Sequence, residues 1–141
     1  MTTLRSAPQS RTQYAWPLPD DAKAVGQARM SIRGVLTELG LDADLVDDAV
    51  LMVSELVTNA LLYGDAPYEL AVNADAREIV CVVVDSGKPL PAPRTPDDGS
   101  ERGRGLHIVA ALSEGFYGCH PQRYVTCPEH TGKATWFALP R

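Results

Sequence analysis

The stretch "LMVSELVTNALLYGD", residues 51–65, has the apolar spacing of an amphipathic helix that ends at Gly64. The polar side of this helix offers hydroxyl, amide and carboxylate groups and has no lysine or arginine; it consists of Ser54, Glu55, Thr58 and Asn59. A solvent-exposed helix face usually mixes both signs of charge. The stretch therefore has two interpretations, a plain solvated stripe or a set of side chains that bind a ligand.

Glu55 and Asn59 are the members of this stripe with the clearest chemistry. They are four residues apart, so their side chains project side by side from one ridge of the helix. Mg²⁺ prefers oxygen ligands and keeps several waters beside them. The Asn59 carbonyl can therefore bind the metal directly, while the Glu55 carboxylate can act as a general base. From the helix alone, solvation explains the stripe at least as well.

The composition bounds the class of protein. A chain of 141 residues with 45% hydrophobic residues favours one compact globular domain. The formal net charge is −5, which argues against nucleic acid as a direct partner, because phosphate binders are basic. No apolar run approaches the ~18 residues of a membrane span, and the first residues contain no apolar core of a secretory signal. We therefore expect a cytoplasmic protein without a membrane contact. The three cysteines are an odd number and do not make a disulfide framework.

The apolar periodicity predicts strands and helices in the order β α α β β, long loop, α β β. The predicted elements are a strand over 12–19, helices over 20–39 and 42–63, strands over 68–75 and 78–85, a helix over 106–114, and strands over 115–119 and 133–140. The segments 86–105 and 119–132 are predicted to be irregular. This order predicts an α+β fold, a two-layer α/β sandwich with helices on one face of a mixed sheet. We expect residues 1–11 to form a mobile tail and residues 12–141 to form a single domain.

Asp85 is a second candidate site residue. It ends the buried run "IVCVVV" and is followed by Ser86 and Gly87. A carboxylate at the end of a buried strand can accept a hydrogen bond from an exocyclic amine such as that of adenine. Gly87 has no side chain that would keep a planar base away. The alternative is a common strand-ending turn of Asp, Ser and Gly.

A third motif is "ERGRGLHIV", residues 101–109. Gly103 and Gly105 precede a predicted helix, whose first amides are unpaired and available to phosphate oxygens. Arg102 and Arg104 would add positive charge there. A flexible loop that ends in a helix is the alternative interpretation.

Taken together and in this chain order, the three motifs resemble the GHKL superfamily of Bergerat-fold ATP-binding domains. The N-box corresponds to "ELVTNALLYG", the first glycine box to "DSG" and the second to "GRGL". Within the superfamily, "VSELVTNAL", "GRGLHIVAAL" and the final "GKATWFALP" are most similar to the anti-sigma-factor serine/threonine kinase branch of actinobacterial type. The resemblance covers about residues 12–140.

The resemblance implies a role for each matched residue. Asn59 would hold a Mg²⁺ ion that bridges the ATP phosphates, and Glu55 would be the base that activates the substrate hydroxyl. Asp85 would contact the adenine amino group, with Gly87 beside the base. The phosphates would be covered by Gly103, Arg104, Gly105 and Leu106. The loop over about 88–102 would form the ATP lid.

The resemblance also implies a reaction and partners. The reaction is transfer of the γ-phosphoryl group to a serine or threonine of an anti-sigma-factor antagonist, a STAS-type protein, which depends mainly on positioning and charge neutralisation. Sequestration of a sigma factor is the other activity of this branch. Members of the family often form homodimers.

Three departures from the family pattern favour an alternative, a non-catalytic nucleotide-binding anti-sigma or adaptor module that sequesters its partner. Lys88 and Pro89 follow Gly87 where many members have a further glycine. Tyr63 precedes Gly64 where this branch often has histidine. The lid is short and rich in proline, which restricts its backbone. A detached ATPase domain of a histidine kinase is disfavoured, because the chain is too short for the helical hairpin that carries the phosphorylated histidine.

The segment "CHPQRYVTCPEHTG", residues 119–132, combines ligands that zinc accepts. They are Cys119, His120, Cys127 and His130. Their spacing matches no familiar zinc site, so a plain surface loop is the alternative interpretation.

Overall fold

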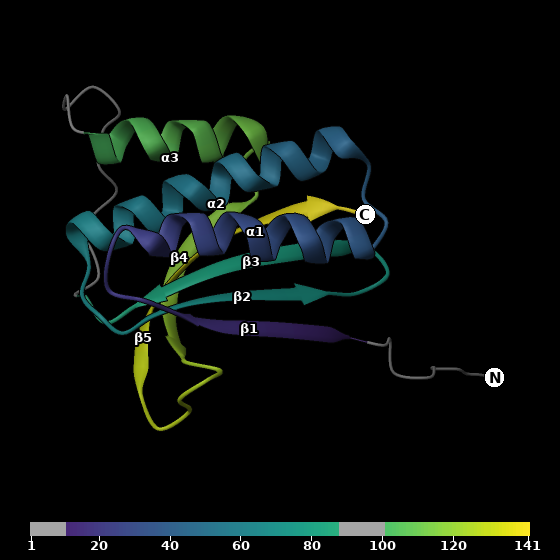
Figure 1. Ribbon diagram of the computed structural model, residues 1–141. Coiled ribbons are helices and arrows are strands. Elements are labelled where there is room, and N and C mark those ends of the chain that lie inside the picture. The colour runs from purple at the N-terminus through teal and green to yellow at the C-terminus, as the bar shows by residue number, and fades with distance from the viewer. Residues whose placement is uncertain (1–10, 88–100) are drawn as a thin grey trace.

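The computed structural model describes residues 11–87 and 101–141, and of residues 101–106 the backbone alone. Its elements, in chain order, are β1 (Thr12–Leu18), α1 (Lys23–Glu38), α2 (Ala43–Tyr63), β2 (Tyr68–Ala74), β3 (Glu78–Asp85), α3 (Glu101–Leu112), β4 (Tyr117–Arg123) and β5 (Thr131–Pro140). The three helices lie together on one face of the sheet (Figure 1). The predicted α+β two-layer fold is therefore confirmed. Residues 1–10 of the predicted tail and residues 88–100 of the predicted lid lie outside the described residues.

The sheet has the strand order β1-β2-β3-β5-β4, and all four neighbouring pairs are antiparallel. The prediction of a mixed sheet is wrong. Strands β3 and β4, which α3 separates in the sequence, do run in the same direction, because each of them is antiparallel to β5. However, β5 lies between them, so the two parallel strands never become neighbours.

Helix α2 begins and ends at the residues that the sequence indicates. The Asp42 carboxylate accepts hydrogen bonds from the amides of Asp44 and Leu45 at 3.1 and 3.2 Å, which satisfies two amides that the helix leaves unpaired. Gly64 follows the last residue, Tyr63. Among the helices that the structure describes, none is long and apolar enough to cross a membrane.

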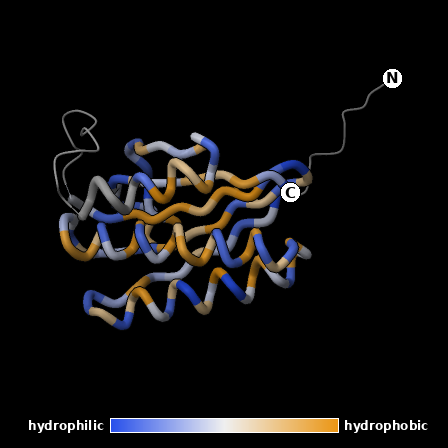
Figure 2. The backbone as a smooth tube through the Cα atoms, turned by 90° about the horizontal axis from the view of Figure 1, so that it is seen from above, coloured by the Kyte–Doolittle hydropathy of each residue, from blue (hydrophilic) through white to orange (hydrophobic). Residues whose placement is uncertain are grey.

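The sheet is covered on both faces over part of its area. Side chains of β3 alternate, so that Ile79, Cys81 and Val83 belong to the main core beneath the helices, while Val82 and Val84 belong to a smaller core on the other face. The smaller core is completed by Ala71, Tyr124 and Ala134. Figure 2 shows hydrophobic residues gathered along the central strands.

The turn between β4 and β5 forms the cover of the smaller core and lies on the sheet face away from the helices (Figure 1). The carboxylate of Glu69 on β2 is fully buried. It accepts hydrogen bonds from the amides of Val125 and Thr126 at 2.9 and 2.7 Å, and from the Thr126 hydroxyl at 2.7 Å. These bonds attach the turn to the sheet.

The two largest differences from the predicted boundaries lie at α3 and β4. Helix α3 begins at Glu101 instead of residue 106, because Gly103 and Gly105 weaken a helix by about 1 kcal/mol each without forbidding it. Strand β4 continues to Arg123, although Pro121 interrupts its sequence. Since β4 is an edge strand, a proline there can be accommodated.

Candidate functional site

Asp85 lies at the end of β3 and is 3% exposed. Asp85 continues the series of alternate residues Ile79, Cys81 and Val83, whose side chains face the helices, so its side chain lies on the same face of the sheet. Its Oδ1 accepts a hydrogen bond from the Gly87 amide at 2.7 Å. This bond fixes the orientation of the carboxylate and uses one of its two oxygens.

Three glycines approach Asp85 so closely that no side chain would fit. A Cβ on Gly64 would lie 2.5 Å from the Asp85 Cγ, and a Cβ on Gly87 would lie 2.8 Å from its Oδ1. A Cβ on Gly132 would lie 2.5 Å from the Asp85 carbonyl oxygen. We call Gly64, Gly87 and Gly132 the glycine collar. Gly87 was predicted as part of the site, whereas the proximity of Gly64 and Gly132 to Asp85 depends on the fold.

Lys133 is the site residue that sequence reasoning missed. It is the cross-strand neighbour of Asp85, and its Nζ lies 3.8 Å from Asp85 Oδ2, with the two side chains 10% and 4% exposed. The sequence does contain a signal for this position. Lys133 is an even number of residues from the buried Phe137 and Leu139 on β5, so the three side chains point to the same face of the sheet. A lysine on the core side of a strand is unusual.

Glu55 and Asn59 are both half-buried on α2. Within the part of the chain that the structure describes, neither side chain makes a hydrogen bond or an ion pair. Gly64, at the end of the same helix, contacts Asp85, and Asn59 lies about 7.5 Å back along the helix axis at 1.5 Å per residue. The helix therefore places Asn59, and then Glu55, at increasing distance from the Asp85 end. Their side-chain oxygens are of the kind that Mg²⁺ prefers as ligands.

The second glycine box lies inside α3, which packs against α2 (Figure 1). The prediction that Gly103 and Gly105 precede the helix is therefore wrong. The side chains of Arg102, Arg104 and Leu106 lie outside what the structure describes. With α3 beginning at Glu101, the amides that a helix leaves unpaired belong to its first turn, residues 101–104.

The surroundings of Asp85 are acidic. Burial, followed by the charges of Asp20, Asp65 and Asp85, raises the pKa of Tyr68. Burial, and then the charges of Asp85 and Glu69, raises the pKa of Tyr124 to about 12. Negative charge at this end favours a ligand group that donates hydrogen bonds, such as an amine.

The zinc alternative does not fit the structure. Among residues 11–87 and 101–141, no group of three or more histidine, cysteine, aspartate or glutamate side chains is placed to hold a metal ion. Cys119 and His120 are exposed on β4, and the His120 Nδ1 lies 2.9 Å from the carbonyl oxygen of Pro121.

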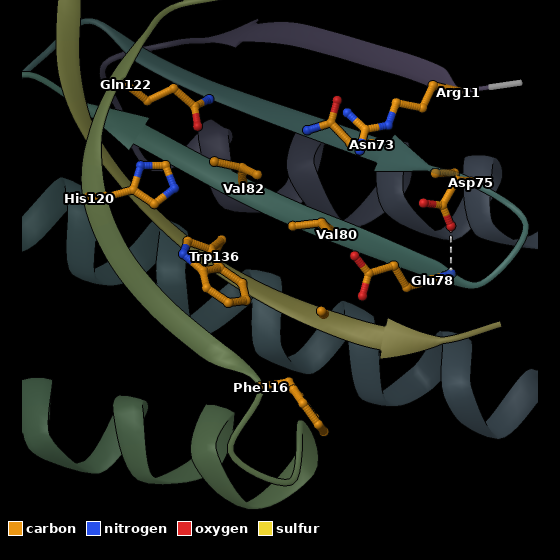
Figure 3. Close-up of a pocket in the computed structure, with 12 residues that line it drawn as sticks. Arg11, Asn73, Asp75, Glu78, Val80, Val82, Phe116, His120, Gln122 and Trp136 are labelled. Atoms are coloured by element: carbon orange, nitrogen blue, oxygen red, sulfur yellow. Dashed lines mark hydrogen bonds between the residues drawn. The ribbon is translucent and has the colours of Figure 1, made fainter. Parts of the chain in front are cut away.

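A groove of about 350 Å³ lies on the sheet face away from the helices (Figure 3). It is lined by Arg11, Asn73, Glu78, His120, Gln122 and Trp136, among others (Figure 3). None of the residues predicted for the ATP site lines it. The groove and the Asp85 site are therefore separate features on opposite faces.

Comparison with known proteins agrees with this arrangement. Residues 18–123 match the family of the histidine kinase-like ATPase domain. The chain is also 27% identical over 116 residues to the serine-protein kinase RsbW of Bacillus velezensis, an alignment that covers 69% of this chain and 71% of that protein. The family match spans α2, β3 and α3, the three elements that carry the predicted site. The chain therefore belongs to the histidine kinase-like ATPase domain family, which confirms the GHKL resemblance.

Proposed function

We propose that this protein binds ATP at the Asp85 end of the sheet and acts as a serine/threonine protein kinase on an anti-sigma-factor antagonist of the STAS type. One observation carries the proposal: Gly64 and Gly87 present bare backbone to a buried carboxylate whose Oδ1 is fixed and whose Oδ2 accepts no hydrogen bond from any described residue. Such a cradle suits a flat base that donates a hydrogen bond from an amine. The similarity to a serine-protein kinase supports the choice of reaction.

The proposed roles follow the order of residues along α2. Asn59 would hold Mg²⁺, which supplies neutralisation of the phosphate charge. Glu55 would accept the proton of the substrate hydroxyl as its oxygen forms a bond to the γ-phosphorus. The bond from that phosphorus to the bridging oxygen then breaks, and ADP leaves. The backbone amides of the first turn of α3, together with Gly103, Arg104, Gly105 and Leu106, would face the phosphates.

The proposal includes the regulatory setting that the family resemblance implies. The protein would act in transcription regulation in the cytoplasm, bind a sigma factor directly, and release it according to the state of the antagonist. A homodimer and membership of the actinobacterial type are part of the same proposal.

A second candidate is a nucleotide-binding anti-sigma or adaptor module without phosphotransfer. Glu55 has no hydrogen-bond partner among the described residues that would orient it as a base. Lys88 and Pro89 also replace the further glycine that many members have after the first box. In this case Asp85 and Asn59 would still bind Mg-ATP, and the bound nucleotide would control the affinity for the partner.

Binding of Mg-ATP is the first test of the proposal. At 100-fold excess over Kd it should stabilise the folded protein by about 2.7 kcal/mol, measured as a rise in melting temperature. Asn59→Ala should remove the part of the shift that depends on Mg²⁺. No shift for the unmodified protein at saturating Mg-ATP would refute the nucleotide site.

Phosphotransfer separates the two candidates. Incubation with labelled ATP and the STAS-type proteins of the same genome should label one of them on serine or threonine. Glu55→Ala should abolish labelling while ATP binding persists. Binding without labelling of any antagonist would favour the second candidate.

A further inference from the structure

Lys133 is a buried charge without a sufficient partner among the residues that the structure describes. Its side chain is nine-tenths buried, with 10% of its surface exposed, and the distance of 3.8 Å to Asp85 Oδ2 is too long for a hydrogen bond. Within the described part of the chain, its ammonium donates no hydrogen bond. Buried ammonium groups normally satisfy their donors, because an unpaired one is costly. The burial of Lys133 therefore points to an acceptor that a ligand supplies.

The position of Lys133 indicates which part of a ligand it meets. Lys133 and Asp85 are opposite each other on β5 and β3. Asp85 Oδ1 accepts the Gly87 amide, while Oδ2 is the oxygen that Lys133 approaches and that accepts no hydrogen bond from a described residue. The pair thus presents one acceptor and one donor side by side, against the bare backbone of the collar glycine Gly64.

We propose that Lys133 reads the edge of the adenine ring, donating a hydrogen bond to the ring nitrogen N1 while Asp85 Oδ2 accepts one from the neighbouring exocyclic amine. This inference rests on the proposed ATP site and adds a residue that determines recognition of the base. Adenine carries its amine donor directly beside the N1 acceptor, so its edge matches the order of the two side chains. The phosphates lie in the other direction, toward Asn59 and the start of α3.

The test removes each partner of the proposed bond in turn. Dissociation constants are measured for ATP and for 1-deaza-ATP, in which N1 is replaced by a C–H group. The unmodified protein should bind ATP about tenfold or more tightly than 1-deaza-ATP, as expected for a hydrogen bond from a charged donor. Lys133→Met should bind ATP about as weakly as the unmodified protein binds 1-deaza-ATP, and should bind both nucleotides equally. Lys23→Met, at an exposed lysine that begins α1, should preserve the full discrimination.

Other outcomes would overturn the inference. Equal affinities of the unmodified protein for the two nucleotides would refute the contact with N1, and this comparison needs no variant. Discrimination that persists in Lys133→Met would show that another group reads N1. Should Lys133→Met not fold, Lys133→Gln keeps a shorter donor and should show reduced but measurable discrimination. Failure of the unmodified protein to bind either nucleotide would refute the ATP site itself, a result distinct from all of these.

Discussion

The carboxylate of Asp85 is held in place by contacts on several sides. The Gly87 amide binds one oxygen, the Gly64 backbone touches the carboxyl group, and Lys133 is the nearest opposite charge. Gly64 has a φ of −103°, a value that any residue can adopt. A glycine is needed at this position because Asp85 lies too close for a side chain. The identity of this residue therefore reflects the site and not the end of α2.

Gly64→Ala should damage the site. Its Cβ would lie 2.5–2.8 Å from the three carboxyl atoms of Asp85, which cannot move without losing the bond to Gly87. We expect a loss of about 1–3 kcal/mol in the free energy of unfolding and at least a tenfold weaker affinity for Mg-ATP. Gly34→Ala is the matched control, because nothing lies within 4 Å of a Cβ there. That helical position should gain up to about 1 kcal/mol with ATP affinity unchanged. Normal ATP affinity of Gly64→Ala would contradict the collar.

Glu69 provides a test of the smaller core at the same scale. Its carboxylate accepts three hydrogen bonds from Val125 and Thr126. Glu69→Gln should lower the free energy of unfolding by about 1–3 kcal/mol, because the new amide nitrogen is a donor facing donors. Glu78→Gln, at an exposed position on β3, should change it by less than about 0.5 kcal/mol. Urea unfolding measures the free energy of unfolding of both variants. Equal losses in Glu69→Gln and Glu78→Gln would show that the turn between β4 and β5 does not need the Glu69 carboxylate.

At the scale of elements, the start of helix α2 was predictable because it is specified locally. The Asp42 side chain accepts hydrogen bonds from the amides of Asp44 and Leu45. The end was predicted correctly from Gly64 as a common stop signal, although Asp85 is what requires a glycine there.

The start of α3 was not predictable, since Gly103 and Gly105 lower the helix propensity of its first turns. The length of β4 depends on its place at the sheet edge, which tolerates Pro121. That place is a property of the whole sheet.

The cap of α2 is open to a direct measurement. Asp42→Ala removes the acceptor for two helix amides and should cost about 1 kcal/mol of stability in urea unfolding. Asp47→Ala, on the same helix, breaks only an ion pair with Arg33 at 3.0 Å, in which both side chains are more than half exposed. Such pairs contribute about 0–1 kcal/mol. A larger loss for Asp47→Ala than for Asp42→Ala would contradict the assignment of the cap.

At the scale of the whole molecule, the contacts that could not be predicted from the sequence join residues far apart in the chain. Glu55, Asn59, Asp85 and Gly87 lie in recognisable local motifs and were predicted. Lys133 becomes a neighbour of Asp85 only through the register between β3 and β5, and Glu69 meets its partners across a gap of more than fifty residues. The direction of the strands was also missed, since it depends on the insertion of β5 between β3 and β4.

The three cysteines differ in how deeply they are buried on the two faces of the sheet, which predicts an order of reactivity. Cys81 is buried in the main core, and burial raises its pKa to about 12. Burial, and then a hydrogen bond with Glu129, raises the pKa of Cys127, which is half-buried, while Cys119 is exposed. Because the thiolate is the reactive form, iodoacetamide at pH 8 should label Cys119 first, Cys127 more slowly and Cys81 only after unfolding. Peptide mass spectrometry measures the order, and early labelling of Cys81 would contradict the described core.

The same burial predicts a loss of stability in alkali. Burial raises the pKa of Cys81 from 9.0 to about 12 and is the main cause that raises the pKa of Tyr124 from 10.0 to about 12. The folded protein therefore holds these two protons more tightly than the unfolded chain. The contribution of these two groups to the free energy of unfolding is complete below about pH 9 and is lost as the pH rises toward 12. Urea unfolding at pH 8 and pH 11 should show this decrease, and Cys81→Val should reduce its size. An identical decrease in that variant would exclude Cys81 as a cause.

The insertion of β5 between β3 and β4 has a consequence during synthesis on the ribosome. Strand β3, with the apolar sequence "EIVCVVVD", emerges well before the strand that covers its free side. Until β5 arrives, β3 is an edge with unpaired backbone groups, the kind of edge that joins other chains. The nascent protein should therefore be prone to aggregation, and its proposed nucleotide site should lack Lys133, up to the moment when β5 joins the sheet.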